Sequence, residues 1–311
     1  MGKVHTVRAK TGLPIIDRFG REWPLHLMIL PAFVITLIFS YGPMYGLIMA
    51  FQDFTPALGF QRSPFVGLEN FRWVFSQPAF VRTIYNTLFI SIFKIVLGTS
   101  AAVFFSLLLN EIRSIFFKRV FQTIIYIPHF ISWVIMAGIM RTLLATNGLV
   151  NNIINAIGGN SVMFLTNPGT FPWTMIWSDV WKGFGFGTVV YLAAITSIDP
   201  ELYESAVIDG AGRFKQALYI TLPMLGPIIV LMVTLALGNV LSAGFDQIFN
   251  LYHPAVYSTG DIIDTYIFRL GLQNGAFAVG AAVGLLRSIV SFVLISLSLY
   301  VAYKVADYKI F

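Results

Sequence analysis

Residues 204–223 read ESAVIDGAGRFKQALYITLP and form a short polar interval between two long apolar stretches. The preceding Asp199-Pro200-Glu201 predicts a helix start, because Asp accepts hydrogen bonds from free N–H groups, Pro suits the first helical position and Glu complements the helix dipole. Gly210 can adopt the left-handed conformation that ends a helix. We therefore expect two short helices, one up to Gly210 and one over 213–219, before Pro223 permits a turn.

The composition of the whole chain is that of a membrane protein. Of its 311 residues, 57% are hydrophobic and 11% are charged, whereas soluble domains carry about 25% charged residues. Residues 1–26 hold five basic residues and no apolar run, so they are not expected to be a cleavable signal peptide. We expect one all-α integral membrane domain rather than a soluble domain with an anchor.

Six apolar segments reach the roughly 20 residues that a helix needs to cross the hydrocarbon core. They lie near 27–51, 84–110, 120–145, 171–197, 224–249 and 277–305. The predicted organisation is a cytoplasmic tail (1–26), a six-helix transmembrane domain (27–305) that contains the loop 199–223, and a cytoplasmic C-terminal tail (306–311). Prolines such as Pro128 and Pro227 interrupt some segments, which membrane helices tolerate when neighbouring groups satisfy the freed backbone.

The distribution of Lys and Arg predicts the orientation in the membrane. Twelve of them lie in the two tails and in the loops after the second and fourth segments, against four in the alternate loops. Basic residues accumulate on the cytoplasmic side of membranes. Both termini and the loop containing Glu204 are therefore expected in the cytoplasm. The net charge of +6 is explained by this asymmetry rather than by nucleic-acid binding.

The complete spacing E-x-A-x3-G-x9-I-x-L-P in residues 204–223 resembles the EAA loop of permease subunits in binding-protein-dependent ABC importers. In that family the loop is a coupling helix seated in a groove of a cytoplasmic ATPase, and Ser205 departs from the usual Ala. The resemblance implies a type I importer fold. It assigns contact with the ATPase to Glu204, Ser205, Ala206, Gly210, Phe214, Ile220, Leu222 and Pro223. A structured loop with no partner is the alternative.

Three further motifs narrow the resemblance. Residues 65–71 (FVGLENF), 126–133 (YIPHFISW) and 245–249 (FDQIF) look like the carbohydrate branch, which includes alginate- and aldouronate-type oligosaccharide importers. The implied function is the membrane subunit of an ATP-driven importer that forms the path for an oligosaccharide. The implied partners are a second homologous permease, two ATPase subunits and an extracellular solute-binding protein, in a bacterial cytoplasmic (inner) membrane.

No enzyme activity is expected of this chain. It has no G-x4-G-K-[ST] loop to hold ATP phosphates, so ATP and Mg are expected only in the partner ATPase and no cofactor is expected here. No metal site is predicted either, because His129 has no Cys or carboxylate cluster near it in the sequence.

Ionisable, polar and aromatic side chains inside the apolar segments are the candidates for contact with substrate. A charged group in a bilayer costs about 2.5–3.5 kcal/mol on insertion scales and usually faces a cavity or a partner. Trp177 and Trp181 share a helix face, and aromatic faces suit the apolar faces of sugar rings. The predicted path comprises Trp177, Asp179, Trp181, Lys182, Asn239, Asp246, Asn250 and Arg287.

Structural explanations compete with each of these assignments. Lys94 could pair with Asp179, or Arg287 with Asp246, as ion pairs that only support the fold. The polar residues of the fifth segment could lie at a subunit interface, and the Trp side chains could pack between helices. If Lys94, Lys182 and Arg287 line the path, they would suit oligosaccharides that carry uronates. The glycines at 183, 185, 187, 280 and 284 are expected to permit close helix packing.

Other function classes remain open. An ion-coupled secondary transporter could use Asp179 and Asp246 as proton carriers, although six helices without an inverted repeat argue against it. An ABC permease for a non-sugar solute would share the cytoplasmic loop. An intramembrane enzyme is disfavoured, because the sequence shows no nucleophile–base or metal constellation.

Overall fold

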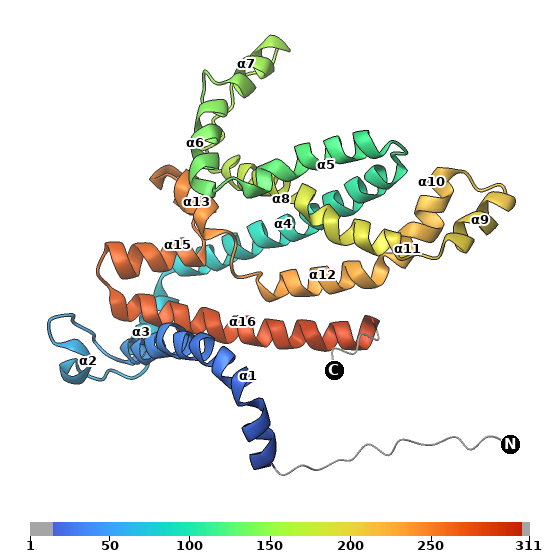
Figure 1. The fold of residues 1–311 in the computed structure, drawn as a ribbon. Helices are drawn as coiled ribbons and strands as arrows, with labels where there is room; N and C mark the ends of the chain where they lie inside the picture. The colour runs from blue at the N-terminus through green and yellow to red at the C-terminus, as the bar shows by residue number, and fades with distance from the viewer. Residues whose placement is uncertain (1–14, 307–311) are drawn as a thin grey trace. The chain divides into compact units, whose positions relative to one another are not determined.

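The computed structural model describes residues 15–306, which fold almost entirely into helices (Figure 1). Within this range the β pairing consists of one isolated bridge between Gln52 and Phe65. The expectation of an all-α chain is confirmed. The predicted tail segments 1–14 and 307–311 lie outside the described residues.

The first apolar segment, taken by itself, is one continuous helical run. It consists of α1 (Ile15–Thr36), a π-helical turn (Leu37–Tyr41) and a 3-10 helix (Gly42–Phe51). The helix begins before the predicted boundary at residue 27, and its span Trp23–Phe51 is long and apolar enough to cross a membrane. Pro43 lacks an N–H and its ring clashes with the carbonyl four residues earlier, which explains why the α-helical ladder changes at this point.

A short outer segment follows, with α2 (Gly59–Arg62) and α3 (Glu69–Ser76). The motif 65–71 has a structural role here. The Asn70 side-chain amide donates to the carbonyls of Ala50 at 3.0 Å and Gln52 at 2.9 Å. The rings of Phe51 and Phe65 stack at 6.4 Å. These contacts fold the segment back on the end of the preceding helix.

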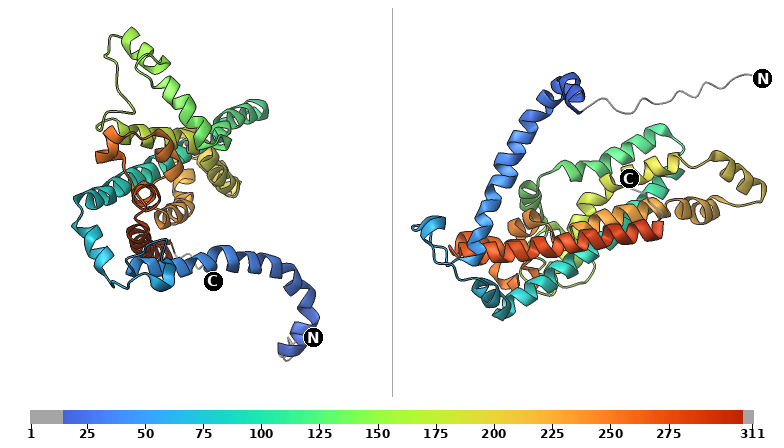
Figure 2. Two further views of the ribbon diagram at one scale, coloured as in Figure 1. Left: turned by 90° about the vertical axis from the view of Figure 1, so that its left-hand side faces the viewer. Right: turned by 90° about the horizontal axis from the view of Figure 1, so that it is seen from below.

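Four long helices form the framework of the rest of the described chain. They are α4 (Pro78–Glu111), α8 (Phe171–Thr196), α12 (Gly226–Gly238) and α16 (Phe277–Ala306). The helix α4 packs along α8, and α12 packs along α16 (Figures 1 and 2). Within residues 15–306, three helices could cross a membrane by length and composition, or up to five if each of two bent helix pairs counts as one span, and α8 is not among them. The predicted count of six spans therefore stays a prediction.

Two of the predicted spans are not single helices, which corrects the sequence boundaries. Segment 120–145 consists of α5 (Ile115–Phe130) and α6 (Trp133–Leu143), which meet at an angle of 101°. Segment 224–249 contains α12, an irregular turn over residues 239–244, and α13 (Phe245–Leu251). Gly244 has φ +95, a left-handed conformation that a glycine adopts without strain and that cannot continue a helix.

The remaining helices are short, and they lie in the connections between the long helices. At one end of the bundle lie α9 (Pro200–Ile208), α10 (Arg213–Gln216), a π-helical turn (Ala217–Thr221) and α11 (Leu222–Met224). Elsewhere in the chain are α7 (Leu149–Ala156), a 3-10 turn (Pro254–Val256), α14 (Tyr257–Gly260), α15 (Ile263–Ile267) and a π-helical turn (Phe268–Gln273). Figure 1 shows α9 and α10 at the end of the bundle opposite α13 and α15.

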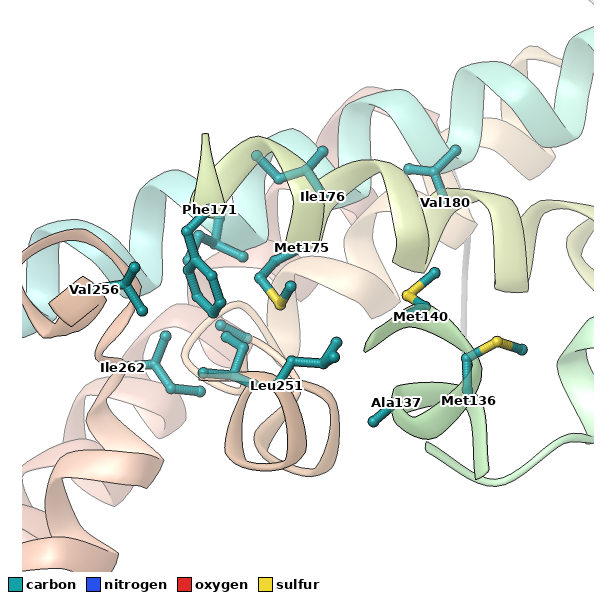
Figure 3. Close-up of a cluster of buried hydrophobic side chains, with 13 residues drawn as sticks. Met136, Ala137, Met140, Phe171, Met175, Ile176, Val180, Leu251, Val256 and Ile262 are labelled. Atoms are coloured by element: carbon teal, nitrogen blue, oxygen red, sulfur yellow. The ribbon is translucent and has the colours of Figure 1, made fainter. Parts of the chain in front are cut away.

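The largest buried cluster joins α6, α8 and α13. Figure 3 shows Phe171 and Met175 of α8 next to Leu251 of α13, with Met136 of α6 in another part of the same cluster. Phe171, Met175, Ile176 and Met136 are fully buried. This packing fixes both elements that follow the helix breaks, α6 and α13, against the same length of α8.

Candidate functional site

The interval 199–223 folds as the capping residues predict. Asp199 accepts a hydrogen bond from the Glu201 N–H at 3.0 Å and starts α9. Gly210, with φ +77, ends it in the left-handed region. The expected second helix is α10 followed by the π-helical turn up to Thr221.

The loop is tied internally and to the bundle. The Tyr203 and Thr221 hydroxyls are 2.9 Å apart and join α9 to the π-helical turn. Arg213 forms an ion pair with Glu111 at 3.3 Å, at the end of α4. Of the predicted coupling residues, Glu204, Ser205, Gly210, Phe214 and Pro223 are exposed, and Ala206, Ile220 and Leu222 are half-buried.

Apolar side chains point away from this loop into solvent. Ile208 is 87% exposed and Phe214 is 80% exposed, and Val207, in the last turn of α9, is also exposed. We call these three residues the apolar knob. Exposed apolar groups gathered on a protruding segment mark a surface that is buried against a partner. Sequence reasoning named Phe214 and missed Val207 and Ile208.

A second constellation lies inside the bundle around Lys94 of α4. Its ammonium donates to the Ala243 carbonyl at 2.8 Å and to the side-chain oxygen of Gln247, and it lies 3.5 Å from Asp179 Oδ1. The Lys94 side chain is 8% exposed. The pairing of Lys94 with Asp179 is therefore present, and two uncharged acceptors complete it.

Gln247 is the centre of this network. The residue is fully buried, and its amide donates to the Met175 carbonyl at 2.7 Å and to Ser178 Oγ at 2.8 Å. It thus joins α13 to α8 while it accepts from Lys94. Sequence reasoning singled out its neighbour Asp246, which is exposed. The signal that could have found Gln247 is its place in the apolar motif 245–249.

Two cavities meet at the Lys94–Asp179 pair. One of about 280 Å³ has polar lining residues, Ser91, Asn239 and Ser242, and we call it the outer cavity. The other, of about 200 Å³, lies toward the α9 end and includes Gly98, Gly183 and Tyr191; we call it the inner cavity. Lys94, Asp179 and Ala236 border both.

Ser91 adds an unexpected feature to the outer cavity. It is 4% exposed, and its hydroxyl has no hydrogen-bond partner in the part of the chain that the structure describes. A buried hydroxyl without a partner is costly. Because Ser91 lines a cavity, a ligand or water hydroxyl can satisfy it. Nothing in the sequence distinguishes this serine from others in α4.

The other predicted cations have protein partners elsewhere. Lys182 donates to the His129 carbonyl at 2.8 Å, at the end of α5, and its ammonium lies 5.4 Å from the centre of the Trp133 ring. Arg287 pairs with Asp264 at 2.6 Å, so its suggested pairing with Asp246 is wrong. These contacts do not bring Lys182 or Arg287 to the Lys94–Asp179 pair.

The tryptophans of α8 form a separate cavity. Trp173, Trp177 and Trp181, with Met140 of α6 and the following Leu144, line a largely apolar space of about 410 Å³. Trp177 is 57% exposed. Residues 177 and 179 are about 200° apart around a helix, so Trp177 and Asp179 face different sides of α8. Asn239 lies in the outer cavity, whereas Asp246 and Asn250 line neither this nor the Trp cavity.

The helix glycines divide into two groups. A Cβ at Gly185 would lie 2.0 Å from the Ile125 carbonyl oxygen, and one at Gly280 would lie 2.9 Å from Gly271 Cα. Gly187 is also tight, at 3.1 Å from Ala102. At Gly183 and Gly284, however, a Cβ would meet no atom within 4 Å. The packing role is confirmed for Gly185, Gly187 and Gly280. Within this chain it is wrong for Gly183 and Gly284.

A family model described as "Binding-protein-dependent transport system inner membrane component" matches residues 94–310. The chain belongs to this family. The permease is 39% identical over 92% of its length, and 90% of the relative's, to the polygalacturonan/rhamnogalacturonan transport system permease protein YteP of Bacillus subtilis. It is 36% identical to protein LplB of the same organism, over 95% and 93% of the two chains.

Solved structures confirm the fold of the permease. A chain of a bacterial ABC transporter involved in the import of the acidic polysaccharide alginate is 39% identical, with a TM-score of 0.86. The match covers 94% of the permease and 99% of that chain. A second alginate transporter structure, in complex with an alginate pentasaccharide-bound periplasmic protein, matches with a TM-score of 0.87 at 38% identity, over 95% and 99% of the two chains. The permease is thus a transport subunit rather than an enzyme.

Proposed function

We propose that this permease is one of two membrane subunits of an ATP-driven oligosaccharide importer in a bacterial cytoplasmic membrane. Its six spans leave both termini in the cytoplasm, and the loop of α9 and α10 docks on an ATPase subunit. ATP and Mg bind to that partner. The apolar knob of Val207, Ile208 and Phe214 carries this part of the proposal, because it is the exposed face of a loop whose base is fixed by Tyr203.

The proposed cargo is an oligosaccharide that contains uronates and is delivered by an extracellular binding protein. Its support is the similarity to permeases for polygalacturonan and to the alginate transporter with its loaded periplasmic protein. Two of the three predicted basic side chains give it no support. Lys94 and Arg287 each pair with a carboxylate, so their charges are already neutralised within this subunit. Lys182 donates to the His129 carbonyl, which carries no charge.

The outer and inner cavities are the proposed path through this subunit. Ser91, Asn239 and Ser242 offer hydroxyl and amide groups, and Asp179 offers a carboxylate acceptor. This set suits the hydroxyl groups of a sugar, which both donate and accept hydrogen bonds. The open space at Gly183 gives the inner cavity room for a ring.

The Trp cavity is a second proposed contact. Trp177 and Trp181 present exposed ring faces in a largely apolar space, and such faces suit the C–H side of a sugar ring. Because these residues lie on a different side of α8 from Asp179, a single sugar ring does not contact both sets at once.

Transport by the reconstituted complex tests the proposal. Both permeases, the ATPase and the binding protein are placed in vesicles, and uptake of labelled alginate or polygalacturonate oligosaccharides is compared with that of neutral oligosaccharides. We expect uptake that requires ATP and the loaded binding protein. Uptake without nucleotide would favour an ion-coupled secondary transporter. If calorimetric titrations show that the binding protein binds only neutral sugars, the proposal of a uronate-containing cargo is refuted.

A further inference from the structure

The Lys94 ammonium holds together three elements that meet beside the proposed path. It extends from α4 to the Ala243 carbonyl in the turn before α13, to Gln247 of α13, and to Asp179 of α8. An ammonium group has three N–H donors. Ala243 and Gln247 accept two of these donors, and the Asp179 carboxylate lies within ion-pair distance of the ammonium.

The three partners differ in how firmly they are held. Ala243 is 2% exposed and Gln247 is fully buried, with its amide bonded to Met175 and Ser178. The Asp179 side chain, by contrast, is 37% exposed and lies 3.5 Å from the ammonium, beyond the usual 2.7–3.2 Å of a hydrogen bond. Asp179 is the exchangeable partner of the three, and it borders both cavities.

The turn that Lys94 holds is also the part of the path that carries polar groups. Asn239 and Ser242 project from this turn into the outer cavity. Gly244 ends the turn with φ +95, and a Cβ built on it would lie 3.0 Å from the Lys94 nitrogen. The ammonium is thus packed directly against the backbone of the joint between α12 and α13.

We infer that Lys94 is a positioning residue that couples the binding of a sugar in the outer cavity to a shift of the turn between α12 and α13. The inference rests on the proposed function. A sugar hydroxyl in the outer cavity donates to Asp179 and replaces its contact with Lys94, while the ammonium keeps the Ala243 and Gln247 oxygens. The Lys94 ammonium then holds the turn over residues 239–244 without its contact to Asp179. The helix α12 connects this turn to α11 and the ATPase-facing loop through a 54° bend at Leu225, so a shift of the joint moves the helix that is attached to the loop.

The test compares two lysines that both donate to a carbonyl at a helix break. Lys94→Met removes the contact with the joint, and Lys182→Met removes the corresponding contact with His129, away from the two cavities. ATP hydrolysis by the full complex is measured with loaded and with empty binding protein. We expect the ratio of the two rates to fall to unity in Lys94→Met and to keep its wild-type value in Lys182→Met. Thermal stability, measured in parallel, is expected to fall in both.

A purely structural role makes a different prediction. If Lys94→Met lowers both rates in the same proportion and keeps their ratio, the inference is wrong. If that variant does not assemble, Asp179→Asn decides, because it removes only the charge of the exchangeable partner and leaves the Ala243 and Gln247 contacts in place; a wild-type ratio there also overturns the inference. A wild-type complex that no oligosaccharide-loaded binding protein stimulates overturns the proposed function itself, and the inference with it.

Discussion

The contact between α5 and α8 at Gly185 allows a quantitative prediction for Gly185→Ala. The new Cβ would lie 2.0 Å from the Ile125 carbonyl oxygen and 2.6 Å from its carbon, both of them backbone atoms that cannot rotate away. Ordinary contact begins near 3.4 Å, so the two helices must separate by about 1.4 Å, which removes attraction along their whole contact. Overpacking of this kind costs about 1–3 kcal/mol.

The matched control is Gly183→Ala on the same helix. Its Cβ meets no atom within 4 Å, and replacing a helical glycine by alanine gains about 0.5–1 kcal/mol. Thermal unfolding of the purified complex, followed by tryptophan fluorescence, is expected to give a lower Tm for Gly185→Ala and an equal or higher Tm for Gly183→Ala. Equal Tm values for the two variants would refute the packing argument.

Four further predictions test the sites. Trp177→Ala is expected to raise the KM for uptake without altering assembly of the complex, and unchanged uptake kinetics would contradict the stacking role. Gly210→Pro forces φ from +77 to about −65, so the protein should insert but lose substrate-stimulated ATP hydrolysis. Phe214→Asp should abolish co-purification of the ATPase. If the ATPase still co-purifies with this variant, the apolar knob is not part of the docking surface. Arg287→Met strands the Asp264 carboxylate, which is 13% exposed; stability should fall by less than the roughly 3–5 kcal/mol of a fully buried pair, and Asp264→Asn in the same chain should restore part of the Tm.

The cytoplasmic loop could be predicted because its signals are local. Asp199 and Gly210 determine the two ends of α9 through their own backbone chemistry, whatever the rest of the chain does. The helix breaks could not be predicted in the same way. Pro128 lies inside α5, yet the chain departs from the helix only after Phe130, where Lys182 from another helix supplies a donor.

The candidate path shows the same limit. Asp179 and Asn239 were singled out as polar groups within apolar segments, and the structure brings them to one cavity. Their helical spacing could not reveal that Trp177 faces another side of α8, or that the cations are used by carbonyls and carboxylates. Ser91 was missed because an uncharged polar residue in an apolar helix carries no sequence pattern of its own, and the one signal for Gln247 was its place in the motif 245–249.

The two lysine contacts also bear on how the chain is made. Synthesis proceeds from the N-terminus, so Lys94 is already present when Ala243 is made. The Ala243 carbonyl can therefore accept from the Lys94 ammonium as soon as the turn forms. The His129 carbonyl emerges before Lys182 exists. An unsatisfied carbonyl in lipid costs several kcal/mol. We therefore expect the third segment, residues 120–145, to insert into the membrane as a straighter helix. The 101° bend between α5 and α6 is then expected to form only after the fourth segment lies beside the third.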